Sequence, residues 1–209
     1  MEMTTSRALA ELKLLDKRIR GTIEKGTFAG LAQGKKSITG YETNDEFIKA
    51  ANSSIQSAQD LIKRRQAIKS AIVNSNAKTE VTIADKKMSV AEAIERKSSI
   101  EYEKLLLQKL KTKYFSAKDD LENKNSLVRD KLDELLEAHF GKDSSQKIKS
   151  DDIKTIADPY LEQNEWRLIA PKNMEKIITE IEEDINNFEL EVDYTLSEIN
   201  AITKIVIDD

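Results

Sequence analysis

The sequence predicts a mainly α-helical protein: an elongated helical bundle or coiled coil, with a small sheet of about three strands, based on a β-hairpin, at one tip. Charged residues make up 34% of the chain and aromatic residues only 5%, a composition that suits long amphipathic helices better than a thick globular core. Two long segments also repeat apolar residues at helical spacing, and one short segment between helices alternates apolar and polar residues.

The longest predicted helix runs from Ser89 to Phe140 without a proline or glycine. Ser89 and Glu92 are spaced for a capping box at its start, and Gly141 can take the left-handed conformation that ends a helix. Its apolar seam, interrupted by Lys124 or Asn125, consists of Leu107, Leu110, Tyr114, Ala117, Leu121, Val128, Leu132 and Leu135. A seam of this kind is typical of a helix that packs along partner helices.

Two further helices are predicted before this one. The first covers Ser6 to Lys25 and gives way to a glycine-rich connection between Gly21 and Gly40, which lacks the Gly-Lys-Ser/Thr ending of a phosphate-binding loop. The second starts with a capping box at Thr43 and Glu46 and extends toward Val73.

A β-hairpin is predicted at Thr79 to Met88, with a turn at Asp85-Lys86 and Met88 opposite Ile83. After Gly141, Ile148, Ile153 and Ile156 indicate a short helix that ends before Pro159, and Trp166 to Ala170 is a candidate extended segment closed by Pro171. The last helix is predicted from Met174 to Ile199, followed by a strand at Thr203 to Ile207. Its apolar seam comprises Met174, Ile178, Ile181, Ile185, Phe188, Val192, Leu196 and Ile199.

Two stretches of the chain share the pattern Asn-Ala-x-Thr-x-(Val/Ile)-x-Ile, at residues 76–83 and 200–207, each directly after a long amphipathic helix. Chance is the alternative explanation for one short match. On the favoured interpretation, the last strand joins the hairpin as a third strand, because a lone hairpin is marginally stable in water.

This organisation predicts one domain made of three segments. Residues 1–140 supply the N-terminal helices, the glycine-rich loop, the hairpin and the long helix. Residues 141–172 form an irregular insertion, and residues 173–209 return a helix and a strand onto the first part.

The net charge of −4 conceals a polarity, because the chain is positive up to Lys118 and negative from Asp119 onward. We expect the two parts to pair within one chain. The alternative is that they guide head-to-tail association of neighbouring copies.

The side-chain inventory argues against an enzyme. Without cysteine there is no disulfide, thiolate metal site or cysteine nucleophile. The one histidine, His139, falls in the last turn of the long helix, where it can interact with the helix dipole. We therefore predict no catalytic residue, no metal and no cofactor, and the chain contains no apolar run long enough to span a membrane.

The candidate partner contacts are Lys63, Arg64, Arg65 and Trp166. A basic run can bind nucleic acid, but no aromatic residue is interleaved with this one and the second part of the chain is acidic, which argues against that function. Trp166 can anchor a partner or, as the structural alternative, fill the core between the sheet and the short helix.

Similarity to known proteins is carried by residues 7–12, 15–19, 63–65, 75–79, 90–97 and 197–201. These segments resemble a group of helical proteins from bacteriophages and prophages of Gram-positive bacteria and, more distantly, the septicolysin-like proteins. The insertion between Gly141 and Pro171 departs from the shorter septicolysin-like pattern. The resemblance implies a phage-encoded protein made with the virion proteins.

Two functions are consistent with these observations. The first is a non-enzymatic structural or assembly protein of the virion, assembled in the host cytoplasm, whose partners are other virion proteins or copies of itself. The second is a soluble phage factor that binds and modulates a host protein through Trp166 or the glycine-rich segment.

Overall fold

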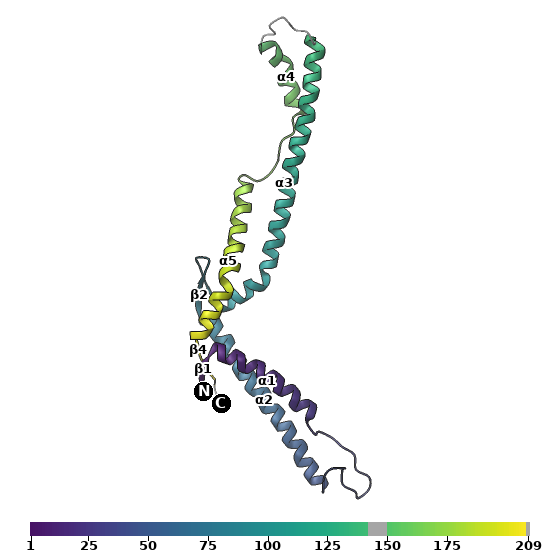
Figure 1. Ribbon diagram of the computed structural model, residues 1–209, viewed down its shortest axis with the longest axis vertical. Helices are drawn as coiled ribbons and strands as arrows, with labels where there is room; N and C mark the ends of the chain where they lie inside the picture. Colours follow the sequence, from purple (N-terminus) through teal and green to yellow (C-terminus); the bar gives the residue numbers. More distant parts are fainter. Residues whose placement is uncertain (142–149, 208–209) are drawn as a thin grey trace. The chain divides into compact units, whose positions relative to one another are not determined.

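The computed structural model describes residues 1–141 and 150–207 (Figure 1). Its elements are β1 (Glu2–Thr4), α1 (Thr5–Lys25), α2 (Asn44–Lys78), β2 (Glu80–Ile83), β3 (Lys86–Ser89), α3 (Val90–Phe140), α4 (Ser150–Asn164), α5 (Met174–Ile202) and β4 (Lys204–Val206). The mainly α-helical class predicted from the sequence is therefore confirmed.

The chain divides into two compact units. The first comprises Met1–Ser99 and Asn186–Asp209, and the second comprises Ile100–Ile185. The division into three segments of one domain stays a prediction.

The ends of α3 follow the chemistry expected from the sequence. The Glu92 backbone N–H donates to Ser89 Oγ over 3.2 Å, and the Ser89 N–H donates to the Glu92 carboxylate over 2.6 Å. These bonds form the predicted capping box, and the Ser89 bonds lower the pKa of Glu92 because they stabilise its ionised form. Gly141 has a φ of 80° at the other end, as a left-handed helix stop requires.

The start of α2 confirms Thr43 as its cap, since Thr43 Oγ1 accepts a hydrogen bond from the Glu46 N–H. The Glu46 carboxylate reaches back to the Glu42 N–H rather than to Thr43, so the box is only partly formed. The helix also continues past Val73 to Lys78.

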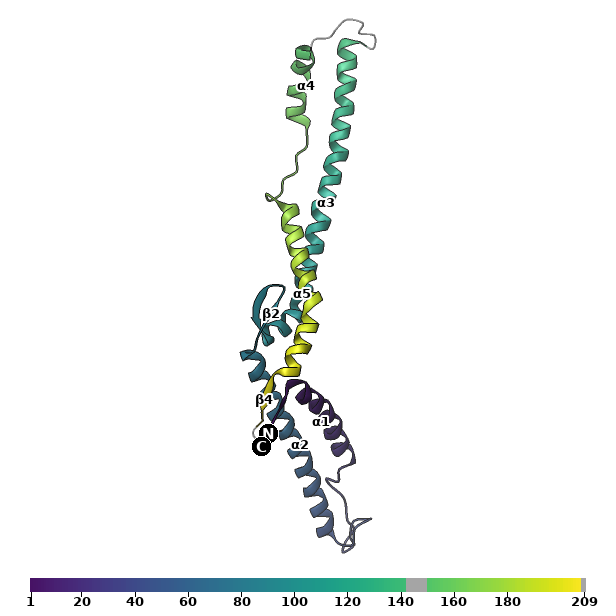
Figure 2. The ribbon, with the colours of Figure 1, turned by 60° about the vertical axis from the view of Figure 1, so that its left-hand side comes forward.

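In the first unit, α1 and α2 lie side by side, with the β1–β4 ribbon across their ends (Figures 1 and 2). The helices and the ribbon share one core: Met3, Ala8, Leu12, Leu15, Ile68, Ile72, Ile205 and Ile207. Helix α1 supplies its apolar stripe at helical spacing, and the strands supply alternate residues, so three elements close a core that none could bury alone.

The predicted three-stranded sheet is wrong. Strand β4 pairs antiparallel with β1, and β2 pairs only with β3, so the described residues form two separate two-stranded sheets. The physical reason is that β1 offers Met3 opposite Ile205, and both side chains are buried in the core of α1 and α2.

The hairpin turn also differs from the prediction. Ala84 and Asp85 are the two turn residues, with φ of 50° and 60°. Positive φ at both positions matches the twist of the flanking strands in a two-residue turn. Met88 therefore lies opposite Val81, and Ile83 pairs with Lys86.

The two strand pairs are built in the same way. Each pair, together with the helix before it and the helix after it, is called a junction below. The hairpin junction is the end of α2, β2, β3 and the start of α3. The terminal junction is the end of α5, β4, β1 and the start of α1. Val81 pairs with Met88 in the first, and Ile205 pairs with Met3 in the second. Both junctions lie in the first unit.

The correspondence extends to the backbone and the caps. The Thr79 carbonyl accepts from the Val90 N–H, and the Thr203 carbonyl accepts from the Thr5 N–H, both over 2.9 Å. Thr4 caps α1 as Ser89 caps α3. The shared sequence pattern around Thr79 and Thr203 therefore marks one junction that occurs twice.

In the second unit, α3 packs against the first part of α5. Of the predicted seam residues, Ile178, Ile185 and Leu132 are buried, whereas Leu135 is exposed and Leu136 is the half-buried residue. Leu107, Leu110, Tyr114, Ala117, Leu121, Val128, Met174 and Ile181 are all half-buried. The seams thus close at least partly within the chain.

Ion pairs run alongside this seam and join the basic part of the chain to the acidic part. Lys111 contacts Glu182 at 2.5 Å and Lys118 contacts Glu175 at 2.7 Å. The bond to Glu175 raises the pKa of Lys118, and the same contact lowers the pKa of Glu175. The expected pairing of opposite charges within one chain therefore occurs at these positions.

The prediction of a helix end before Pro159 is wrong, because α4 includes Pro159 and ends at Asn164. A proline in a helix removes one main-chain hydrogen bond and does not by itself prevent further turns. Ile148, on which part of that prediction rested, lies outside the described residues. The candidate extended segment from Trp166 to Ala170 forms no regular secondary structure.

Candidate interaction surfaces

The predicted basic run on α2 is mostly engaged within the chain. Arg64 pairs with Glu11 at 3.1 Å and Arg65 pairs with Asp16 at 2.5 Å, so both side chains fasten α2 to α1. Lys63 is exposed and remains available to a partner. The structure therefore brings only one of the three predicted basic contacts to the open surface.

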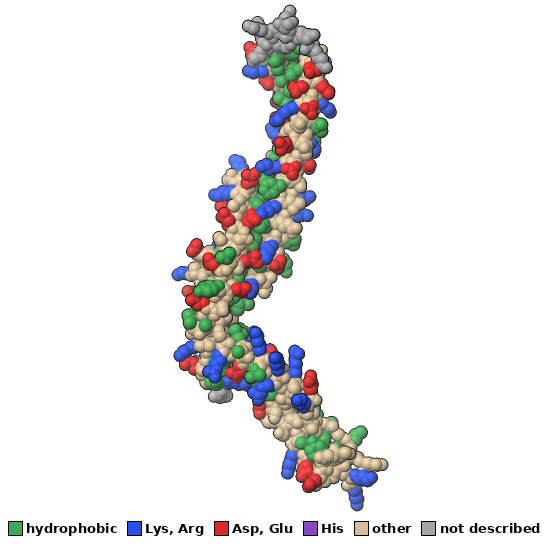
Figure 3. All heavy atoms as spheres, in the orientation of Figure 1, with side chains coloured by type: hydrophobic (Ala, Val, Ile, Leu, Met, Phe, Trp, Pro, Cys, Tyr) green, Lys and Arg blue, Asp and Glu red, His purple; other side chains and the backbone are tan. Residues whose placement is uncertain are grey.

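Four other cations lie on α1. Lys13, Lys17, Arg18 and Arg20 are exposed, and within residues 1–141 and 150–207 none of them forms an ion pair. Lys and Arg side chains are prominent along α1 and α2 on the face shown in Figure 3.

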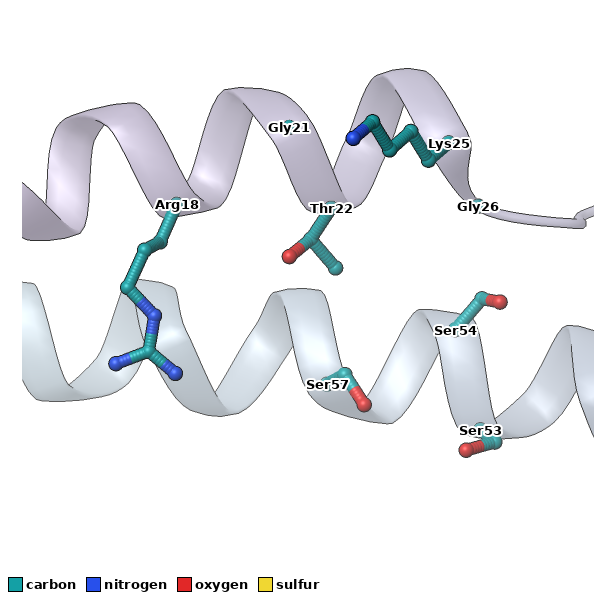
Figure 4. A pocket seen from close by; sticks show the side chains of 8 residues that line it. All are labelled: Arg18, Gly21, Thr22, Lys25, Gly26, Ser53, Ser54 and Ser57. Carbon is teal, nitrogen blue, oxygen red and sulfur yellow. The ribbon is translucent and has the colours of Figure 1, made fainter.

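A shallow groove of about 440 Å³ lies between the end of α1 and α2 (Figure 4). It is lined by Arg18, Gly21, Thr22, Lys25, Gly26, Ser53, Ser54 and Ser57. Figure 4 shows Arg18 reaching from α1 toward α2, while the hydroxyl of Thr22 faces the gap. A Cβ built on Gly21, one of these lining residues, meets no atom within 4 Å.

Chemically, the groove offers hydroxyls and cations but no acid, so it can contact a small anion. The carbonyl end of α1 opposes that use, because it carries the negative end of the helix dipole. Lys25, in the last turn, already offsets this dipole. We therefore assign the groove no reaction and no ligand.

Trp166 is positioned by α3. The Asn125 side chain accepts from the Trp166 backbone N–H over 2.8 Å and donates to its carbonyl over 3.0 Å. Lys124 Nζ lies 4.0 Å from the centre of the indole ring, within the range of a cation–π contact. Trp166 as a whole is 53% exposed, so the interpretation of Trp166 as a core residue is wrong.

Two exposed apolar patches complete the candidate surfaces. On α3 in the second unit, Tyr102, Leu105 and Leu106 are all more than half exposed. On the part of α5 in the first unit, Leu190 is 83% exposed and Tyr194 is 72% exposed. Residues at these spacings share one helix face.

Sequence reasoning missed the α5 patch because it followed only the buried seam. Leu190 and Tyr194 fall between the seam residues in the sequence. Large apolar residues outside the seam could have indicated an exposed patch. It also treated Asn125 as an interruption of the seam, whereas Asn125 fixes the backbone of Trp166.

His139 lies in the last turn of α3, as predicted, with its ring edge-on to Phe140. In the described part of the chain, no group of three or more histidine, aspartate or glutamate side chains is arranged to hold a metal ion. None of the described helices combines the length and apolar character needed to cross a membrane. The expectations of no catalysis, no metal and no cofactor stay predictions.

Comparison of the chain with models of protein families, with curated proteins and with solved structures found no match.

Proposed function

We propose that this chain is a non-enzymatic structural or assembly protein of a bacteriophage particle, assembled in the host cytoplasm, which acts through helix packing and oligomerisation. The phage origin rests on the resemblance of its helix-end and hairpin segments. The mode of action is supported by one observation, the exposed apolar patch of Tyr102, Leu105 and Leu106 on α3.

The patch is separate from the seam that α3 uses within the chain. Leu107 and Leu110 belong to that seam and are half-buried, whereas Tyr102 is 77% exposed. Burial of an exposed large apolar side chain contributes roughly 1.5–3 kcal/mol. Three such residues on one face therefore favour contact with another protein surface.

Two measurements test this proposal. Quantitative mass spectrometry of purified particles should find the chain at a fixed copy number. Light scattering after size-exclusion chromatography should show association of the pure protein or its complex with other virion proteins, and Leu105→Lys with Leu106→Lys should weaken it. Ser126→Lys, at an exposed position further along the same helix, is the matched control. A stable monomer that never occurs in particles would refute the proposal.

A second candidate function is favoured by the geometry of Trp166. Its backbone is fixed by Asn125 while half of its side chain remains open to solvent, and a held aromatic side chain is a common anchor of protein interfaces. A soluble phage factor that modulates a host protein would use such an anchor. A pull-down from host lysate should then recover one partner that is lost with Trp166→Ala and retained with Tyr102→Ala.

A further inference from the structure

The two junctions provide an internal comparison of exposed residues. Counted back from Thr203 and Thr79, Leu190 and Tyr194 of α5 stand where α2 carries Gln66 and Ser70. All four side chains are exposed. Since the hairpin junction keeps polar residues at these positions, the junction itself does not require an apolar residue there.

The same two helix stretches carry opposite charges. Residues 62–78 of α2 contain no acidic residue, and residues 186–202 of α5 contain no basic residue. The α2 stretch contains Lys63, Arg64, Arg65, Lys69 and Lys78, and the α5 stretch contains Glu189, Glu191, Asp193 and Glu198. Within the described residues, Lys63, Lys69 and Glu198 form no ion pair.

The exposed apolar residues of α2 and α5 also stand at different corresponding positions. On α2, exposed Ile62 and Val73 flank the polar positions described above, and the corresponding residues of α5 are Asn186 and Ser197. The α2 face is therefore basic with apolar residues at its ends, and the α5 face is acidic with apolar residues in its middle. Their opposite charges make the two faces electrostatically complementary.

We infer that the outer face of α5, centred on Leu190 and Tyr194, binds the outer face of α2, with Lys63 and Lys69, on a second copy of this chain. The second copy is the occupant because the chain itself carries an exposed helix face of the opposite charge. The inference rests on the proposed function and identifies the two helix faces through which the copies would associate. Because the two faces differ, the contact is heterologous and forms a closed ring or an extending chain, or a dimer in which it occurs twice.

The first experiment replaces the α5 patch with the residues that α2 has at the same positions. The double variant Leu190→Gln with Tyr194→Ser should fold, because the hairpin junction already accepts these residues. Sedimentation velocity over a concentration series should show weaker association, with dissociation at protein concentrations at least about tenfold higher than for the parent chain, the effect of losing one interface anchor. Leu14→Gln, at an exposed apolar position of α1, is the matched control and should associate as the parent chain does.

The second experiment reverses charge. Lys69→Glu and Glu198→Lys should each weaken association, and an equimolar mixture of the two variants should associate more strongly than either alone. Association of the parent chain should also weaken as salt rises, because exposed charges are screened.

The outcomes separate this inference from the proposed function. If the parent chain associates and Leu190→Gln with Tyr194→Ser associates equally well, the inference is wrong and the structural role stands on another surface. If the parent chain is monomeric at every concentration, the inference is also wrong. The proposed function then fails only if the chain is absent from purified particles as well.

Discussion

The hairpin junction and the terminal junction reach the same strand register by different connections. In the first, Ala84 and Asp85 link the two strands directly. In the second, the paired strands β1 and β4 come from opposite ends of the sequence, with Met3 opposite Ile205. A short connection therefore does not set the register. The residues at the helix ends set it, through the same threonine carbonyl and the same hydroxyl cap.

The comparison also shows what each junction adds to the common design. At the position where α1 and α2 are joined by the ion pair of Glu11 and Arg64, α3 and α5 are joined by Arg96 stacked over the ring of Phe188, 4.4 Å from its centre. An ion pair in one junction and a cation–π contact in the other therefore join the two helices at the same position. The backbone is thus conserved between junctions while the side-chain chemistry differs.

The largest expected effect tests whether the two junctions have equivalent cores. Ile83 and Ile207 occupy corresponding, fully buried positions. Replacing either with alanine should lower the free energy of unfolding by about 3 kcal/mol, since each leaves a cavity as well as losing burial. Urea unfolding measures this. Thr82→Ala, at an exposed strand position, should change it by less than about 0.5 kcal/mol. A much smaller loss for Ile207 than for Ile83 would break the equivalence.

A smaller effect distinguishes the two caps. Thr4→Ala and Ser89→Ala each remove a hydroxyl that accepts a helix N–H bond, and each should cost about 1 kcal/mol of stability. Ser89→Ala should cost more, because Ser89 also bonds the Glu92 carboxylate through its hydroxyl. Thermal unfolding of both variants gives the order. Ser89→Thr, which keeps the hydroxyl, should recover most of the loss.

The turn at Ala84 and Asp85 distinguishes the hairpin junction, because no turn joins β4 to β1 among the described residues of the terminal junction. Ala84 has a φ of 50°, a conformation that costs a residue with a Cβ more than it costs glycine. Ala84→Gly should therefore raise the stability by about 0.5 kcal/mol after the added freedom of the unfolded chain is counted. An increase in the melting temperature checks this. Gly34→Ala, at a φ of 59° in the loop between α1 and α2, should act in the opposite direction.

The sequence predicted both ends of α3 because their chemistry is local. Ser89, Glu92 and Gly141 lie within a turn of the ends they define, so spacing alone was sufficient. The repeated pattern around Thr79 and Thr203 likewise predicted that a strand follows each helix.

Strand pairing was not predictable in the same way. The pattern shows where β4 begins but not which strand it meets, because its partner β1 is a three-residue segment at the other end of the chain. A segment of three residues is too short to show the alternation of apolar and polar residues that identifies a strand. The exposure of Trp166 was also not predictable, since it depends on the bond between its backbone and a distant asparagine.

The smallest expected effect concerns pH and distinguishes the start of α3 from the start of α1. Glu92 corresponds to Arg7 in the terminal junction, so only the cap of α3 contains a titrating carboxylate. Bonds from Ser89 lower the pKa of Glu92 below its ordinary value of 4.5. A lowered folded-state pKa contributes stability above the ordinary value, and this contribution is lost as the pH falls through the lowered pKa.

Carboxyl chemical shifts in an acid titration should therefore place the Glu92 transition below its ordinary value. Ser89→Ala removes the hydroxyl bond but keeps the backbone bond, so it should return the Glu92 transition only part of the way toward its ordinary value. Thr4→Ala should leave the Glu92 transition unchanged. Because the bond fixes the first turn of α3, amide shifts there should follow the same transition and those of α1 should not. A common transition in both helices would mean that acid acts on the whole first unit rather than on one cap.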